Sequence, residues 1–309
     1  MNPLAKILVY VVAVVLIAAL LAPPVYWGAQ AMAAHGIVPS LAGFPFFRFF
    51  SRILQISALV LLWPTIRWLR IGSFAELGLE RNPHGRRDLA VGIAAALGPL
   101  IVLGIGYYAL EIYKPSNDFR WVQLLRALGT GAVVGVVEEI LFRGVLLGLA
   151  MRYIGRLPGL AVISFVFAIV HFLKPRAEIT EVHWWSGFEL LGSAIDNRIP
   201  MSLVIAGGIA LFVIGLILGA VTMRTHSLWL AIGLHAGWVF GQQSINSIGK
   251  FRVKPPDELL PWVGPNVVSG MVPTGLVPMA ALLVTALMLW WYLARGTSGI
   301  SRRSTGDAG

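Results

Sequence analysis

The chain contains no cysteine among its 309 residues. That absence excludes disulfides, cysteine-ligated zinc, iron–sulfur clusters and catalysis by a thiol. Charged residues are also scarce, at 12% of the sequence, whereas a soluble domain carries about twice that fraction. Because hydrophobic residues make up 57% and the mean hydropathy is +0.79, the composition predicts an integral membrane protein.

Sustained alternation of apolar and polar residues, which marks the strands of a transmembrane barrel, is also missing. The apolar residues are instead gathered in runs, and a helix that crosses a bilayer needs about 20 such residues. These runs predict an all-α protein, a polytopic transmembrane helical bundle of about eight transmembrane helices. The eight runs cover residues 7–27, 53–69, 89–112, 127–151, 158–173, 201–222, 227–245 and 273–294.

No internal repeat or low-complexity linker divides these runs, which predicts a single transmembrane helical domain over residues 1–295. The remaining segment, 296–309, is rich in glycine and serine and is predicted to be a disordered C-terminal tail. The first run has a second interpretation, because Lys6, the apolar stretch and the small residues at 29–35 also resemble a secretory signal. The stretch reaches Trp27, which is long for a signal and favours an uncleaved first helix.

The formal net charge of +10 raises the question of nucleic-acid binding. The basic residues lie mostly in short segments between the apolar runs, where membrane topology and lipid headgroups account for them. The sequence therefore predicts the lipid bilayer as a partner and no nucleic acid. The density of Lys and Arg in the loops favours both termini in the cytoplasm, and the expected location is the bacterial cytoplasmic (inner) membrane.

Three charged residues, Glu138, Glu139 and Arg143, interrupt the fourth apolar run. An ionised side chain near the centre of a bilayer costs about 2.5–3.5 kcal/mol, so such residues persist where they pair or face a polar cavity. Glu139 and Arg143 are four residues apart and are predicted to pair on one helix face. Glu138 lies about 100° round the helix, on a stripe with Gly131 and Gly135 that predicts close approach of a neighbouring helix.

Two other apolar runs each contain a histidine, His171 in one and His235 in the other. A carboxylate with two imidazoles can hold and deprotonate a water molecule, with or without a metal ion. Glu138, His171 and His235 are therefore predicted to face one cavity. The alternative is a polar network that only fixes helix packing. A transporter or proton relay is a third hypothesis, because buried Glu and His also mark those proteins, but the chain shows no inverted repeat.

At these residues the chain resembles the CAAX prenyl protease type 2 family, also called the CAAX protease and bacteriocin-processing family of intramembrane proteases. The resemblance covers about residues 127–242 and has three parts. Glu138, Glu139 and Arg143 match Glu-Glu-x-x-x-Arg, and Phe-x-x-x-His is matched by the segment that ends at His171. The third part is His-x-x-x-Asn, in which His235 is present and Val239 stands where the motif has Asn.

The resemblance implies an intramembrane endopeptidase that hydrolyses a peptide bond in a membrane-associated peptide or protein substrate. It makes Glu138 the general base that activates water and His171 a group that holds this water. His235 would stabilise the oxyanion, and Glu139 with Arg143 would set the geometry of the helix. Metal dependence is left open. Glu138, His171 and His235 could hold a divalent metal such as zinc. Alternatively, Glu138 could act without a metal ion, which is favoured because the positive charge of the nearby Arg143 repels a cation.

Val239 departs from the family pattern and has no hydrogen-bond donor for an oxyanion. The loss of one such donor can lower the rate by about 10²–10³. Another group could supply the donor, with Trp238 better placed along the helix than Gln242 or Gln243. Otherwise the alternative function applies, which is a catalytically silent membrane binding or scaffold protein that uses the same pocket.

Overall fold

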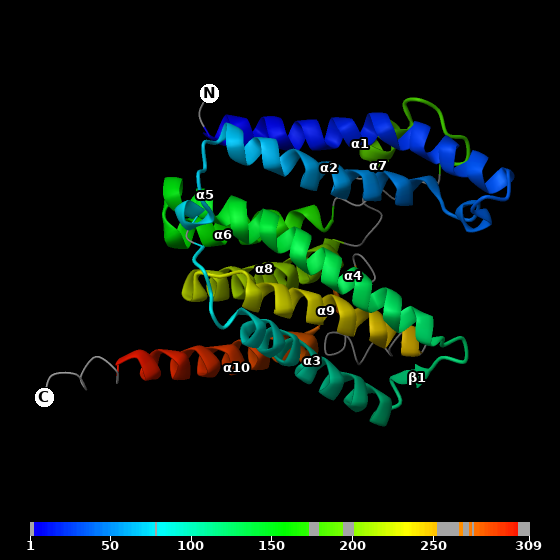
Figure 1. The fold of residues 1–309 in the computed structure, drawn as a ribbon. Coiled ribbons are helices and arrows are strands. Elements are labelled where there is room, and N and C mark those ends of the chain that lie inside the picture. Colours follow the sequence, from blue (N-terminus) through cyan, green and yellow to red (C-terminus); the bar gives the residue numbers. More distant parts are fainter. Residues whose placement is uncertain are drawn as a thin grey trace, which may run out of the picture. The chain divides into compact units, whose positions relative to one another are not determined.

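The protein is almost entirely α-helical in its computed structural model, which describes residues 3–77, 79–172, 179–193, 201–251, 266–267, 272–273 and 275–301. Each of the eight apolar runs lies on a helix within these residues, which confirms the all-α fold class (Figure 1). The chain divides into two compact units. One comprises Met1–Ser73 and Phe172–Arg198, and the other comprises Phe74–His171 and Ile199–Gly309.

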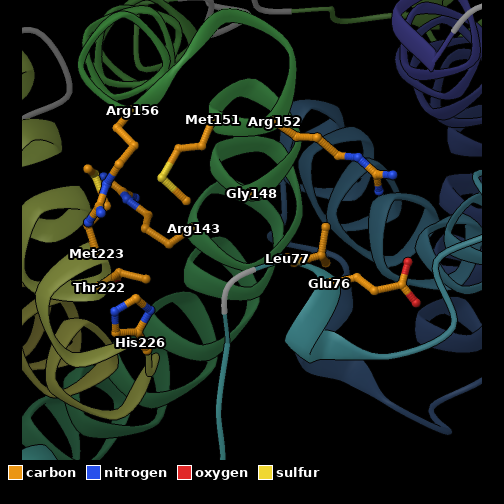
Figure 2. Close-up of a pocket in the computed structure, with 10 residues that line it drawn as sticks. All are labelled: Glu76, Leu77, Arg143, Gly148, Met151, Arg152, Arg156, Thr222, Met223 and His226. Atoms are coloured by element: carbon orange, nitrogen blue, oxygen red, sulfur yellow. The ribbon is translucent and has the colours of Figure 1, made fainter.

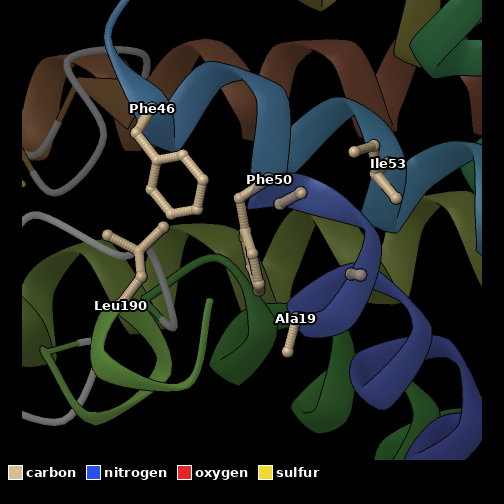
Figure 3. Packing of buried hydrophobic residues seen from close by; sticks show 7 residues of the cluster. Ala19, Phe46, Phe50, Ile53 and Leu190 are labelled. Atoms are coloured by element: carbon tan, nitrogen blue, oxygen red, sulfur yellow. The ribbon is translucent and has the colours of Figure 1, made fainter. Parts of the chain in front are cut away.

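The first unit packs two long helices and a short one around small residues. Alanines of α1, including Ala19, leave room for Phe46 and Phe50 of α2 and Leu190 of α7 (Figure 3). Gly187 of α7 lies directly against the backbone of Ala19, where a side chain would not fit. The elements of this unit are α1 (Pro3–Ala34), η1 (Pro39–Leu41), α2 (Phe46–Trp68) and α7 (Ser186–Ser193).

The second unit contains the remaining helices and two small antiparallel strand pairs. Its helices are η2 (Phe74–Leu77), α3 (Gly85–Ala109), α4 (Trp121–Glu139), η3 (Ile140–Leu146), α5 (Leu147–Ile154), α6 (Arg156–Val170), α8 (Met201–Thr225), α9 (Trp229–Ile248) and α10 (Leu276–Ser301). Its strands are β1 (Tyr113–Pro115) and β2 (Gly249–Phe251), which pair with Tyr113 opposite Phe251, and β3 (Asn266–Val267) and β4 (Val272–Pro273).

Helix α9 lies between α3 and α4 in the second unit, and glycines bring the three backbones together (Figure 1). A Cβ atom added at Gly131 of α4 would lie 2.7 Å from the carbonyl oxygen of Ala236, and one at Gly135 would lie 2.9 Å from its nitrogen. On the other side, a Cβ at Gly92 of α3 would lie 2.5 Å from the carbonyl oxygen of Leu230. The close approach predicted for the stripe of Gly131 and Gly135 is therefore confirmed.

A π-helical segment follows the two glutamates of the fourth apolar run. Helix α4 continues without interruption through η3 into α5, and in η3 the N–H of Leu147 donates to the carbonyl of Phe142, five residues earlier. Such π-bulges insert an extra residue into a helix and are frequent at functional sites. Arg143 lies inside this segment, and Glu139 directly precedes it.

Five of the described helices are long and apolar enough to cross a bilayer, and α6 is a shorter apolar helix. These helices support an integral membrane protein, whereas the number of about eight spans is not confirmed. The prediction of one domain over 1–295 stays a prediction. Helix α10 extends to Ser301, and the rest of the predicted tail, 302–309, lies outside the described residues. The five spans are Ala5–Ala34, Phe46–Trp68, Gly85–Ala109, Val204–Thr225 and Leu276–Arg295.

The contact between α4 and α9 can be tested with two glycines of the same helix. Gly131→Ala places a methyl group against the backbone of α9, so we expect a lower midpoint of thermal unfolding. Gly129→Ala is the matched control, because nothing lies within 4 Å of a Cβ added there. Alanine is favoured over glycine in a helix by about 1 kcal/mol, so the control should be as stable as wild type or more stable. Equal midpoints for the two variants would contradict the close approach.

Candidate active site

A buried ion pair lies at the start of the π-helical segment. Arg143 Nη1 donates to Glu139 Oε1 at 2.8 Å, and the two residues are only 2% and 0% exposed. The pairing predicted from their four-residue spacing is confirmed. Arg143 Nη2 also donates to the carbonyl oxygen of Gly215 in α8 at 3.4 Å. The guanidinium carbon lies 4.3 Å from the ring centre of Phe167 in α6, a cation–π contact.

Glu139 also orients His235 of helix α9. The distance from His235 Nδ1 to Glu139 Oε1 is 2.7 Å, and both groups are buried. The Nδ1–H group donates to the carboxylate, which fixes the rotation of the imidazole ring. The opposite nitrogen, Nε2, then faces Glu138 and lies 3.8 Å from its Oε2.

His171 is held in the same manner by the backbone of its own helix. Its Nδ1 lies 2.7 Å from the carbonyl oxygen of Phe167. Because a carbonyl oxygen can only accept, Nδ1 must carry the hydrogen of this bond. The Nε2 atom of His171 lies 4.0 Å from Glu138 Oε2. His171 therefore presents the same ring nitrogen to Glu138 that His235 does.

Glu138 is the least enclosed member of the group. Its side chain is 26% exposed, whereas the side chains of Glu139 and His235 are 0% and 6% exposed. Within the described part of the chain, its inner oxygen Oε2 is buried and accepts no hydrogen bond. The distances of 3.8 and 4.0 Å to the two imidazoles are too long for hydrogen bonds. A carboxylate oxygen and two ring nitrogens thus converge on one position without satisfying one another.

Phe167 forms an aromatic wall of this group. Its ring contacts Phe142 edge-on, with the centroids 5.3 Å apart, and lies 4.5 Å from the ring of His171. The ring of His235 lies 5.9 Å away in a T-shaped arrangement. Phe167 therefore packs against Arg143 and both histidines, which gives a physical role to the first residue of the Phe-x-x-x-His motif.

The donor set has the chemistry of a zinc site but a wider spacing. Tetrahedral zinc with bonds of about 2.0–2.2 Å brings two ligand atoms to about 3.3 Å from each other. The separations of 3.8 and 4.0 Å in this site exceed that value. Among the residues that the structure describes, no group of three or more His, Asp or Glu side chains is arranged to hold a metal ion. Metal binding by Glu138, His171 and His235 therefore stays a prediction.

The five residues predicted for the site meet in the second unit, on α4, η3 and α9 and at the C-terminal cap of α6. Two contacts of the site were not predictable from the sequence. The bond from His235 to Glu139 joins residues 96 positions apart, and sequence reasoning had linked Glu139 to Arg143 alone. The acceptor on α8 is the backbone carbonyl of Gly215, which no side-chain pattern reveals. The catalytic roles of the five residues stay predictions.

The fold and the site together define an α-helical integral membrane protein with a carboxylate–imidazole centre. Residues 120–241 match the model of the family described as Type II CAAX prenyl endopeptidase Rce1-like. This segment, less than half of the chain, contains the first two motifs and the histidine of the third, and the match confirms the resemblance to the CAAX protease family. The family is a protease family, which supports a hydrolase that acts on a peptide or protein at the membrane. No curated protein and no solved structure matches the chain.

The buried ion pair generates a prediction about stability. Arg143→Ala leaves Glu139 without its cation in a dry setting, and breaking a buried pair in this way costs about 3–5 kcal/mol. Arg143→Lys keeps a positive charge, so we expect more folded protein and a higher midpoint of thermal unfolding than for Arg143→Ala. Arg126→Ala, an exposed position in α4, controls for the general loss of an arginine. Equal yield and midpoint for the two Arg143 variants would rule out a stabilising pair.

Proposed function

We propose that the protein is an intramembrane endopeptidase in which Glu138 activates the attacking water. The observation that carries this proposal is the convergence of Glu138 Oε2 with the Nε2 atoms of His171 and His235. Glu138 Oε2 accepts no hydrogen bond from the described residues, and a water molecule held between it and the two imidazoles can donate to it. We further propose that the enzyme works in the bacterial cytoplasmic membrane with both termini in the cytoplasm, as the loop charges favour.

In the proposed reaction, Glu138 takes a proton from the water while the water oxygen attacks the carbonyl carbon of the scissile peptide bond. The protonated Glu138 then gives this proton to the leaving nitrogen as the C–N bond breaks. His171 holds the water through Nε2, because its Nδ1–H is used by the carbonyl of Phe167. This mechanism needs no metal ion, and the spacing of the acceptors, wider than that of zinc ligands, supports it.

His235 is proposed to stabilise the oxyanion. To donate from Nε2, its ring must carry hydrogens on both nitrogens, because Nδ1–H is already donated to Glu139. The resulting positive charge would lie between the carboxylates of Glu138 and Glu139, with Arg143 balancing the second of them. The four charges then sum to zero, so the buried site can hold an imidazolium without an excess charge.

The role of Glu138 can be tested by mapping protein termini. Glu138→Gln keeps the shape of the side chain but removes the base, so we expect cleavage to fall by about 10²–10⁴. New termini of membrane-associated proteins, mapped by mass spectrometry, should appear in cells that produce wild type and not in cells that produce Glu138→Gln. The purified variant should unfold at the wild-type temperature, since Glu138 Oε2 accepts no hydrogen bond from the described residues.

Two controls make this test specific. Glu80→Gln removes an exposed carboxylate outside the site and should leave all new termini in place. Purified wild type dialysed against a chelator should keep its activity, whereas loss of activity that zinc restores would support the metal-dependent alternative. If wild type and Glu138→Gln give the same termini, the catalytically silent binding protein becomes the better function.

Val239 generates a separate prediction about the oxyanion. With valine at the motif position, we expect Trp238 to supply the second donor through its indole N–H, so Trp238→Phe should lower the rate by about 10²–10³. Val239→Asn restores the donor of the family pattern and should offset the loss in a Trp238→Phe, Val239→Asn double variant. The measurement is the rate of one cleavage found by mapping termini. An unchanged rate in Trp238→Phe would dismiss Trp238 as the donor.

A further inference from the structure

A cavity of the second unit is lined by basic residues, and the proposed hydrolysis of the peptide bond does not take place in it. It has a volume of about 250 Å³ and lies where α5 ends, α6 begins and α8 ends (Figure 2). The lining residues are Glu76, Leu77, Arg143, Gly148, Met151, Arg152, Arg156, Thr222, Met223 and His226.

Two of the lining arginines, Arg143 and Arg156, lie on one side of this cavity, whereas Arg152 extends toward the other side (Figure 2). Figure 2 shows Arg143 and Arg156 extending toward Thr222 and Met223 of α8, whereas the only acidic lining residue, Glu76, points away from them. The side chain of Arg143 is buried in the fold, since the residue is only 2% exposed. Among the described residues Arg156 forms no ion pair. Because Glu139 balances the charge of Arg143, the uncompensated positive charge on this side of the cavity is that of Arg156, which favours an anion there.

The start of α6 adds to the preference for an anion. Arg156 is its first residue, the first turn contains no acidic side chain, and no side chain caps the helix. The free N–H groups and the dipole at such a helix start favour a negative charge, but a positively charged arginine occupies this position. An anion bound by Arg156 would therefore accept hydrogen bonds from the N–H groups of the first turn of α6 and would also neutralise the charge of the arginine.

The surroundings of the cavity indicate that the anion is part of a lipid. Leu157, next to Arg156, is 74% exposed, and Tyr153 and Ile154 at the end of α5 are also exposed apolar residues. Apolar side chains beside a basic cavity at the ends of membrane helices suit acyl chains next to a charged headgroup. A soluble anion would use the arginines but not these apolar neighbours.

A second basic pocket lies at the same end of the unit. Its volume is about 560 Å³, and its lining includes Arg81, Arg86, Arg87 and the partly exposed Trp229. The N–H of Glu80 donates to the carbonyl of His226 at 2.7 Å, which joins the segments that carry the two pockets. A tryptophan among arginines is the composition expected at a membrane surface that carries anionic lipids.

We propose that the cavity between Arg143 and Arg156 binds the phosphate headgroup of an anionic phospholipid. Arg156 donates to the phosphate oxygens, Arg143, whose charge is balanced by Glu139, forms a buried wall of the cavity, and Leu157 with Tyr153 contacts the acyl chains. This site is separate from the cleavage reaction, so it stands even if the protein proves catalytically silent.

The test measures lipid binding to the purified full chain in a neutral detergent. Phosphatidylglycerol is added, bound lipids are counted by native mass spectrometry, and the midpoint of thermal unfolding is recorded. We expect one tightly bound phosphatidylglycerol and a higher midpoint for wild type. Arg156→Gln should weaken this binding about tenfold, since a hydrogen bond to a charged group is worth about that factor. Arg156→Lys should bind with intermediate strength because it keeps the charge but not the planar donor pair.

Arg224→Gln is the matched control, because Arg224 is an exposed arginine in the last turn of α8 that does not line the cavity. It should bind the lipid as wild type does. Equal weakening in Arg224→Gln would overturn the site in favour of a diffuse charge effect. An equal shift of the midpoint with phosphatidylcholine, or with glycerol 3-phosphate at the same concentration, would overturn the anionic lipid as the ligand. No bound lipid and no shift would overturn the proposal entirely.

Discussion

The arrangement of the second unit depends on one buried carboxylate. Glu139 is fully enclosed and accepts hydrogen bonds from Arg143 and His235 through the same oxygen. A charge in that position is tolerated only when it is paired and hydrogen-bonded. Arg143 in turn reaches the backbone of α8 and the face of Phe167 on α6. Four helices are thereby joined by a single network, so a shift of α6, α8 or α9 would break a contact of the buried Arg143 or Glu139.

This network positions the groups that do the proposed chemistry. Glu139 holds Nδ1 of His235, and the carbonyl of Phe167 holds Nδ1 of His171, so both rings turn Nε2 toward Glu138. Fixing one ring nitrogen to select the role of the other is a common way of orienting histidines at reactive sites. The site therefore requires little rearrangement to accept a water molecule, because its polar atoms are aimed before a substrate arrives.

The helices and the charged centre were predictable from the sequence for physical reasons. A membrane helix must consist of a long apolar run, so the eight runs indicated where helices lie, and charges inside such a run had to pair or face a cavity. Spacing alone predicted the contact of Glu139 with Arg143 and the close approach of a neighbouring helix to the glycine stripe, and the structure identifies that helix as α9. The π-helical turn and the acceptor Gly215 were not predictable, because both depend on backbone contacts that leave no pattern of side chains.

Two identical side chains at adjacent positions serve different purposes because a helix turns by about 100° per residue. That turn directs Glu139 into the interior, where Arg143 and His235 use it, and leaves Glu138 partly exposed with an unsatisfied oxygen. A carboxylate held by an ion pair and a hydrogen bond is stabilised but is not available as a base, whereas a carboxylate without such partners is available but costs stability. Placing the pair one residue apart lets Glu139 stabilise the helix packing while Glu138 stays open to water. The hydrogen bonds agree with this division, because Oε1 of Glu139 accepts two of them, whereas Oε2 of Glu138 accepts none from the described residues.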